Sequence, residues 1–205
     1  MPKILSEADI EAFRTRLCDV AENLFAAHGP DGVTMRQLAD ALSVSSMTPY
    51  RYFRDKDAIL AAVRTRAFNR FAAAMEAAGA PASAPTDKSP GGAYFDFALA
   101  NPAAYRMMFD VNQPTASDYP DLVEAMDRAR LTMGAALRRL EEEGAISGDV
   151  DLMAHAFWSA MHGAVMLDLA GLLESPLDAR AVARPALEAL GSRFGIPWPW
   201  RSTRD

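Results

Sequence analysis

Apolar residues recur every three or four positions along most of the chain, and this spacing is typical of α-helices that bury one face. The first such stretch runs from about Ser6 or Asp9 to Ala27, and Gly29-Pro30 ends it. Its apolar face consists of Ile10, Phe13, Leu17, Val20 and Leu24. The pattern therefore predicts a long amphipathic helix near the start of the chain.

A capping box marks the start of a second, shorter helix. Thr34 can cap this helix, and Gln37 three residues later can reach back to the N–H of the cap. Val33 and Leu38 are placed to pack against each other as a hydrophobic staple. We therefore expect a short helix that begins at Met35.

Another short helix is expected directly afterwards. The pattern breaks at Ser43-Val44, and residues 46–53, SMTPYRYF, can donate hydrogen bonds, stack or carry positive charge. Pro49 falls in the first turn of this segment, where its missing N–H costs at most one bond, so the helix is expected to persist. Asp55 then caps a longer helix that reaches about Ala78. Two helices joined by a turn of about four residues form a helix-turn-helix, which lays its second helix in the major groove of DNA.

The helical pattern continues through the rest of the chain after Gly79–Gly92, a stretch rich in Pro, Gly, Ser and Ala that predicts a mobile loop. The expected helices are two pieces within Ala93–Val111 divided at Asn101-Pro102, one over Tyr119–Glu143, one capped by Asp149 or Asp151, and one over Asp178–Phe194. The helix after Asp149 is apolar on nearly every side, so we expect it to contact more than its own domain. These elements predict an all-α fold with a helix-turn-helix domain at residues 1–68 and a larger helical domain at residues 69–205.

Composition and charge agree with this division. With half of its residues apolar, a chain of 205 residues can bury one or two modest cores. The net charge of −6 is unexpected for a DNA-binding chain, but the first 68 residues hold nine Lys or Arg and nine Asp or Glu, so the acidic excess lies in the remainder. Between Ser45 and Arg66, five basic residues stand against two acidic ones. This local excess lies where DNA phosphates would be.

Other kinds of site are disfavoured by the residues present. Cys18 is the single cysteine, which offers no disulfide framework or zinc cluster and favours a reducing cytoplasm. His155 and His162 would lie about 10.5 Å apart along a helix, too far to share one metal ion. The N-terminus lacks the apolar core of a signal peptide, and polar residues interrupt the apolar stretch 154–173. We therefore expect no metal, no cofactor and no membrane segment.

The pattern G-V-T-x-R-x-L-A-x-x-L-x-V-S-x-x-T-x-Y-x-Y-F-x-x-K-x-x-[IL]-L spans residues 32–60 and combines caps, turn, aromatic pair and lysine in order. It resembles the N-terminal domain of the TetR family of transcriptional regulators. Two positions depart from the family, with Ser43 where the turn usually has glycine and Pro49 where leucine is common. Serine adopts a left-handed conformation less readily than glycine, so we expect an altered or stiffer turn.

The resemblance implies a set of DNA-binding residues. These are Arg36, Ser46, Met47, Thr48, Tyr50, Arg51, Tyr52 and Lys56. Arg51 can reach a guanine edge or a phosphate, and Thr48 a base edge or a thymine methyl group. The two tyrosines are expected to hold phosphates through their hydroxyls, although one of them, like Phe53, could instead pack the small domain.

A second resemblance covers the larger domain. Trp158, His162 and Gly163, together with residues 94–110, YFDFALANPAAYRMMFD, resemble the C-terminal domain type of TetR regulators named for a Trp-His-Gly signature. This resemblance implies a helical sensor domain that dimerises through its last two helices. An apolar and aromatic pocket for a hydrophobic effector would be lined by Phe97, Tyr105, Met108, Phe109, Met126, Met133, Trp158, His162 and Met166. The same residues could instead form ordinary core, and His162 could be a hydrogen-bonded interior residue.

The resulting hypothesis is a cytoplasmic, ligand-responsive DNA-binding regulator. It would bind a palindromic operator in double-stranded DNA as a homodimer, most simply as a repressor released by a small apolar or aromatic effector. The main alternative is a helical interaction protein or small-molecule-binding protein without specific DNA binding. Catalysis is the weaker hypothesis, because no Ser-His-Asp order, glycine-rich phosphate loop or paired carboxylate stands out.

Overall fold

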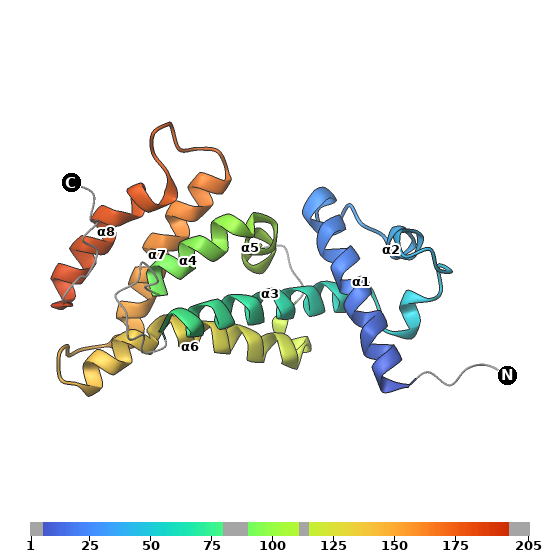
Figure 1. Cartoon of the computed structure of the whole chain (residues 1–205), viewed down its shortest axis with the longest axis horizontal. Coiled ribbons are helices and arrows are strands. Elements are labelled where there is room, and N and C mark those ends of the chain that lie inside the picture. Colours follow the sequence, from blue (N-terminus) through green and yellow to red (C-terminus); the bar gives the residue numbers. More distant parts are fainter. Residues whose placement is uncertain (1–5, 80–89, 111–114, 197–205) are drawn as a thin grey trace. The chain divides into compact units, whose positions relative to one another are not determined.

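The computed structural model of the chain describes residues 6–79, 90–110 and 115–196, and within these ranges it consists of helices and connecting segments without a strand (Figure 1). The α-helices are α1 (Glu7–His28), α2 (Met35–Ala41), α3 (Lys56–Gly79), α4 (Pro90–Ala100), α5 (Pro102–Phe109), α6 (Pro120–Glu142), α7 (Val150–Leu169) and α8 (Ala179–Phe194). Two short 3₁₀ helices are η1 (Pro49–Arg51) and η2 (Ala116–Asp118). The predicted all-α fold is confirmed. No helix in the described ranges combines the length and apolar character needed to cross a membrane.

The chain forms two compact units. The N-terminal unit comprises Met1–Arg70 and Ala103–Asp127, and the C-terminal unit comprises Phe71–Pro102 and Arg128–Asp205. The helices α3 and α6 each contribute residues to both units. The predicted domain division at residue 68 differs from this arrangement in the stretch 103–127, which packs with the N-terminal unit.

Local capping determines where most of the helices begin. Ser6 caps α1 and Thr34 caps α2, each in a capping box with the side chain three residues later. The Asp55 carboxylate accepts a hydrogen bond from the Ala58 N–H at the start of α3 (2.7 Å). Asp149 and Asp178 do the same for α7 and α8. The starts predicted at Met35, after Asp55 and after Asp149 are therefore confirmed.

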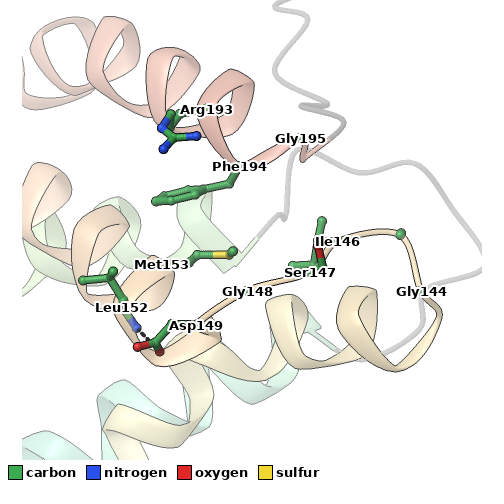
Figure 2. A pocket seen from close by; sticks show the side chains of 11 residues that line it. Gly144, Ile146, Ser147, Gly148, Asp149, Leu152, Met153, Arg193, Phe194 and Gly195 are labelled. Carbon is green, nitrogen blue, oxygen red and sulfur yellow. Dashed lines mark hydrogen bonds between the residues drawn. The ribbon is translucent and has the colours of Figure 1, made fainter.

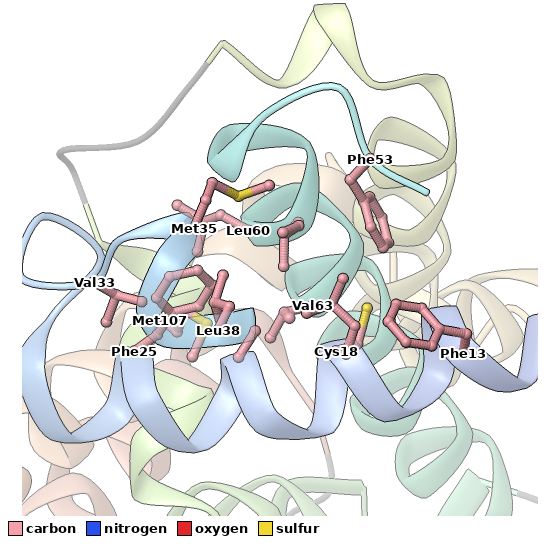
Figure 3. Packing of buried hydrophobic residues seen from close by; sticks show 13 residues of the cluster. Phe13, Cys18, Phe25, Val33, Met35, Leu38, Phe53, Leu60, Val63 and Met107 are labelled. Carbon is pink, nitrogen blue, oxygen red and sulfur yellow. The ribbon is translucent and has the colours of Figure 1, made fainter. Parts of the chain in front are cut away.

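The core of the N-terminal unit lies where α1, α2 and α3 meet (Figure 3). The staple residues Val33 and Leu38 are both buried in it, beside Phe25 of α1 and Leu60 of α3. Met107 of α5 belongs to the same cluster. Burying apolar surface stabilises the folded chain by about 0.8 kcal/mol per methylene group. The shared core therefore stabilises the packing of the stretch 103–127 against the helix-turn-helix.

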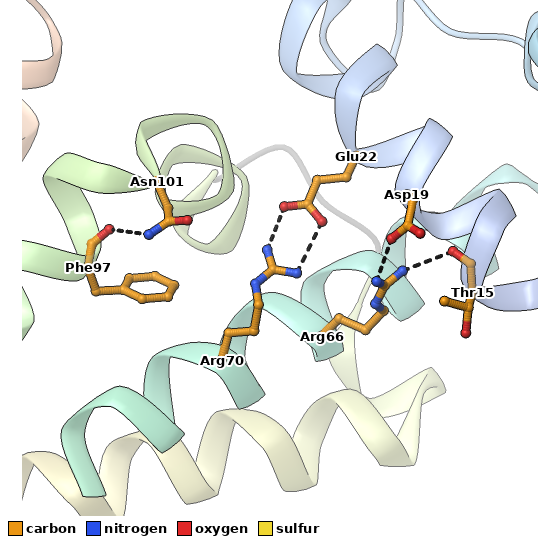
Figure 4. A network of polar contacts seen from close by, with 7 residues as sticks. All are labelled: Thr15, Asp19, Glu22, Arg66, Arg70, Phe97 and Asn101. Atoms are coloured by element: carbon orange, nitrogen blue, oxygen red, sulfur yellow. Dashed lines mark hydrogen bonds and ion pairs between the residues drawn. The ribbon is translucent and has the colours of Figure 1, made fainter. Parts of the chain in front are cut away.

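Ion pairs join α1 to α3 within the N-terminal unit (Figure 4). Arg66 donates to the Asp19 carboxylate and to the Thr15 carbonyl, and Arg70 donates to Glu22 through both of its terminal nitrogens. These pairs orient α3 against α1, and their exposed positions limit their contribution to stability.

The C-terminal unit is built on α7 and α8. One stripe of α8, with Ala183 and Leu187 in its middle, is buried, and Phe157 of α7 lies 6.2 Å from Phe194 of α8 between ring centroids. Phe71, the first residue of α3 in this unit, packs edge-on against Tyr94 and Phe97 of α4. The helix pair divided at Asn101-Pro102 is confirmed, whereas the predicted loop Gly79–Gly92 ends earlier because α4 begins at Pro90. Residues 80–89 of that loop and residues 197–205 of the C-terminal tail lie outside the described residues.

Candidate nucleic-acid interface

The turn after α2 contains a left-handed residue at Ser43. Ser43 has a φ of +55°, and it is the one residue other than glycine with a positive φ in the described ranges. Its N–H donates to the Asp40 carbonyl (3.0 Å), and the Val44 N–H donates to the Ala39 carbonyl (3.0 Å). This left-handed residue reverses the chain tightly after α2, so serine performs here the role usually given to glycine.

The prediction of an α-helix over residues 46–53 is wrong. The segment forms only the three-residue 3₁₀ helix η1, preceded by a turn in which the Thr48 N–H donates to the Ser45 carbonyl (2.8 Å). The N–H groups of Arg51 and Tyr52 bond to carbonyls three residues back, as in a 3₁₀ helix. Pro49 has no N–H for an α-helical bond to Ser45, and a helix this short has too few other bonds to compensate.

Four residues of this segment lie exposed on the surface. Met47 is 67% exposed and Tyr50 is 47% exposed, and Ser46 and Arg51 are also exposed. Pro49, by contrast, is buried. The segment therefore presents hydroxyl, thioether, phenol and guanidinium groups outward from a packed base.

Three other predicted DNA residues are half-buried and have partners within the unit. The Thr48 and Ser45 hydroxyls share a hydrogen bond (3.0 Å). Tyr52 stacks on Phe13 with 4.1 Å between ring centroids. Lys56 donates through Nζ to the Pro30 carbonyl (2.7 Å). These contacts hold the segment at Thr48 in its middle and at Tyr52 and Lys56 after it, and the packing role considered for Tyr52 is observed for its ring.

Arg14 of α1 contacts the last two residues of the segment, Tyr52 and Phe53. Its Nη1 donates to the Tyr52 carbonyl (2.8 Å), and its guanidinium lies 4.2 Å from the centroid of the Phe53 ring. Phe53 is buried, as expected for a packing residue. The role of Arg14 could not be predicted from the sequence pattern, because its partners lie 38 and more positions away along the chain.

Basic side chains flank the exposed segment. Arg36, the last of the predicted DNA residues, is exposed on α2 with its Nε 3.8 Å from Asp40. Arg54 is exposed beyond η1, with its Nε 3.2 Å from Asp55. An exposed ion pair contributes little to stability, so such an arginine can exchange its carboxylate for a phosphate. The surface formed by α2, the turn and residues 45–56, which we call the reading face, thus combines positive charge with groups that can contact bases.

The predicted effector residues fall into both units. Tyr105 and Met108 are fully buried in the N-terminal unit, where Phe109 packs against Tyr105 and Phe68, and Met126 is half-buried there. In the C-terminal unit Phe97 is buried, whereas Met133, Trp158, His162 and Met166 are half-buried. Trp158 and His162 are neighbours on α7, with 6.1 Å between ring centroids, and burial lowers the pKa of His162. The effector pocket itself stays a prediction.

Each unit contains a hollow that none of these nine residues lines. In the C-terminal unit a groove of about 600 Å³ lies between the Gly144–Asp149 loop, the start of α7 and the end of α8, with Met153 and Phe194 in its wall (Figure 2). In the N-terminal unit a cavity of about 200 Å³ lies between the end of α1 and α5. Over the described part of the chain, no group of His, Cys, Asp or Glu is arranged to hold a metal ion.

A capped helix, a left-handed turn and an exposed polar segment on a three-helix core define a DNA-reading domain of the helix-turn-helix class. A family model described as "Bacterial regulatory proteins, tetR family" matches residues 17–63, and one described as "Tetracyclin repressor-like, C-terminal domain" matches residues 88–190. The chain therefore belongs to the tetR family of bacterial regulatory proteins. This membership confirms the prediction of a transcriptional regulator rather than an enzyme, and the Trp-His-Gly type of the second domain stays a prediction.

Individual proteins resemble this chain in sequence or in fold. The chain is 37% identical over 79 residues to the HTH-type transcriptional repressor Rv1474c of Mycobacterium tuberculosis, a stretch that covers 38% of this chain and 42% of the repressor. A solved structure of a protein with unknown function from Rhodococcus sp. RHA1 is 26% identical, with a TM-score of 0.75 over 95% of this chain and 99% of that one. The TetR family transcriptional regulator PfmR from Thermus thermophilus has the same fold, with 23% identity and a TM-score of 0.63 over 85% and 96% of the two chains.

Proposed function

We propose that this chain represses transcription by binding a palindromic operator in double-stranded DNA as a homodimer, and that a small apolar or aromatic effector releases the DNA. The observation that carries the proposal is the exposure of Ser46, Met47, Tyr50 and Arg51 on a segment that is buried at Pro49 and at Phe53. A segment held in this way loses little conformational entropy on meeting DNA. The repressor function of the relative from Mycobacterium tuberculosis supports the direction of regulation.

The side chains of the reading face suit two kinds of DNA contact, those to phosphates and those to base edges. Arg36 and Arg51 are exposed cations that can hold phosphates, and such contacts make affinity depend on salt. Arg51 can alternatively reach the N7 and O6 acceptors of guanine in the major groove. Tyr50 can donate its hydroxyl to a phosphate. The reading face therefore supplies both positioning and base contacts.

A homodimer through α7 and α8 is supported by the outward side of α7. Leu152 is 61% exposed and Leu167 is 42% exposed, so these apolar side chains gain little free energy of burial in the single chain. Gly163 lies exposed between them, and a Cβ built there meets no atom within 4 Å. Glycine costs an isolated helix about 1 kcal/mol relative to alanine, so its presence fits a close approach by a partner helix. A dimer would set two reading faces about 34 Å apart, or a multiple of that distance.

The effector would act by changing that spacing. It can shift the population between DNA-binding and released forms only by as much as its preference for the released form. The methionine and aromatic residues predicted for the pocket that lie in the C-terminal unit, Phe97, Met133, Trp158 and Met166, suit an apolar or aromatic molecule. The helix α3 is continuous and contributes residues to both units. It could therefore transmit a conformational change from the C-terminal unit to the N-terminal unit, which carries the reading face.

Selection of duplexes from a random pool by the purified full chain tests the proposal. We expect an enriched site with two-fold symmetry and two chains bound per duplex, measured by analytical ultracentrifugation of the complex. Recovery of no enriched sequence would contradict operator binding. An enriched but asymmetric site bound by one chain would contradict the dimer.

A further inference from the structure

Met47 is the most exposed large apolar residue in the described part of the N-terminal unit, with 67% of its surface accessible. A single exposed apolar side chain is ordinary on a protein surface. Here, however, it lies in the middle of the reading face, and Tyr50, three residues later, is 47% exposed. The reading face therefore carries an apolar spot among its polar groups.

The local backbone explains why Met47 rather than Thr48 is presented. Thr48 has helical backbone angles (φ −64°, ψ −45°), and its N–H and hydroxyl are both engaged with Ser45. Thr48 is half-buried and Pro49 is buried. The turn thus directs these two residues inward and leaves Met47 and Tyr50 outward.

The chemistry of the major groove gives this apolar side chain one specific partner. The base edges there present hydrogen-bond donors and acceptors, and the 5-methyl group of thymine is their one apolar feature. A methionine side chain has no hydrogen-bond donor, and its thioether is a weak acceptor. Its unbranched, polarizable chain adapts readily to a small apolar group. Met47 therefore matches thymine better than guanine, cytosine or adenine.

On the basis of the proposed function, we propose that Met47 determines part of the operator sequence by packing against the 5-methyl group of one thymine in each half-site. Arg51, exposed on the same segment, supplies charge at the phosphates or at a guanine, so the two residues read different features. Removing a buried methyl group costs about 0.8 kcal/mol, which is about fourfold in a binding constant.

The test replaces thymine by deoxyuridine, which lacks only the 5-methyl group, at each thymine of the selected operator in turn and symmetrically in both half-sites. Affinities are measured for the wild-type chain and for Met47→Ala, whose fold is checked by circular dichroism. We expect one thymine pair at which deoxyuridine weakens wild-type binding by about fourfold per half-site. Met47→Ala should bind the thymine operator more weakly and should not respond to deoxyuridine at that pair.

Two matched variants act as controls. Met47→Leu keeps an apolar side chain and should keep much of the response to the methyl group. Asp31→Ala alters an exposed residue outside the reading face and should keep the full response.

Specific binding in which every deoxyuridine effect persists in Met47→Ala would overturn the inference and leave the proposed function intact. A selected site without a methyl-sensitive thymine would overturn it equally. Failure to enrich any duplex would instead remove the proposed function and this inference together.

Discussion

The Arg54 guanidinium donates a hydrogen bond to the Tyr119 hydroxyl (2.9 Å) and lies 5.0 Å from the centroid of the Tyr119 ring. Arg54 follows the 3₁₀ helix of the reading face, and Tyr119 directly precedes α6. Both residues belong to the N-terminal unit, yet Tyr119 lies within the stretch that matches the C-terminal family model. This pair joins the end of the reading face to the start of α6.

We expect removal of Tyr119 to loosen the chain around Arg54. Tyr119→Ala deletes both the hydrogen bond and the ring beneath the guanidinium, so amide hydrogen exchange at residues 54–56 should accelerate and operator affinity should fall. Tyr119→Phe keeps the ring contact and should lie between Ala and wild type. Asp118→Ala changes an exposed neighbour and is the control. Unchanged exchange in Tyr119→Ala would show that the pair does not order this segment.

The left-handed turn predicts a stabilising substitution. Ser43 has a φ of +55°, which costs a residue other than glycine about 1–2 kcal/mol, whereas glycine costs about 0.5–1 kcal/mol in additional chain entropy. Ser43→Gly should therefore raise the free energy of unfolding by about 0.5–1 kcal/mol. Urea denaturation with Ser43→Ala as the control measures this. If both variants have the same stability, the turn stores no backbone strain.

The exposed glycine of α7 gives a test of the dimer. A Cβ at Gly163 meets nothing within 4 Å in the single chain, so Gly163→Leu should fold normally. In a dimer packed through α7 the added side chain should hold the helices apart and raise the dissociation constant, measured by sedimentation equilibrium. Ala77→Leu adds bulk to an exposed position of α3 and should leave the dimer unchanged. A dimer that is unaffected by Gly163→Leu must use another surface.

The partial burial of His162 predicts a pH dependence of stability. Burial lowers the pKa of its imidazole below the ordinary value of 6.5, so the folded chain favours the neutral ring. As the pH falls through 6.5 the unfolded chain takes up a proton that the folded chain resists, and stability therefore decreases. His162→Gln should lose less stability than wild type between about pH 7.5 and 5.5 in urea denaturation. His155→Gln, exposed on the same helix, is the control, and equal losses in all three chains would contradict the prediction.

Local signals predicted the fold well because helix starts depend on neighbouring residues. The capping boxes and the aspartate caps involve partners three positions apart, so the starts of α2, α3 and α7 could be predicted from the sequence. The effect of Pro49 could not be predicted from its position alone, because the cost of one missing N–H depends on how many hydrogen bonds the helix has, and this segment has few. The left-handed Ser43 followed from its place in the turn.

The contacts that shape the reading face could not be predicted in the same way. Arg54 and Tyr119 are 65 positions apart, and Arg14 and Tyr52 are 38 apart. A side-chain pattern specifies periodicity along one element, whereas these pairs depend on how the elements pack. The effector residues illustrate the same limit, because apolar and aromatic side chains are equally suited to a core and to a pocket.

The most direct test of DNA reading compares the affinity of the full chain for its selected operator with its affinity for a scrambled duplex of equal length, by fluorescence anisotropy at several salt concentrations. Specific binding should exceed non-specific binding by about 10³ or more. Arg51→Ala should reduce this ratio if Arg51 reads a base, costing about 1–3 kcal/mol, whereas Lys56→Ala should mainly lower the salt dependence. Equal affinity for the two duplexes at every salt concentration would contradict the account.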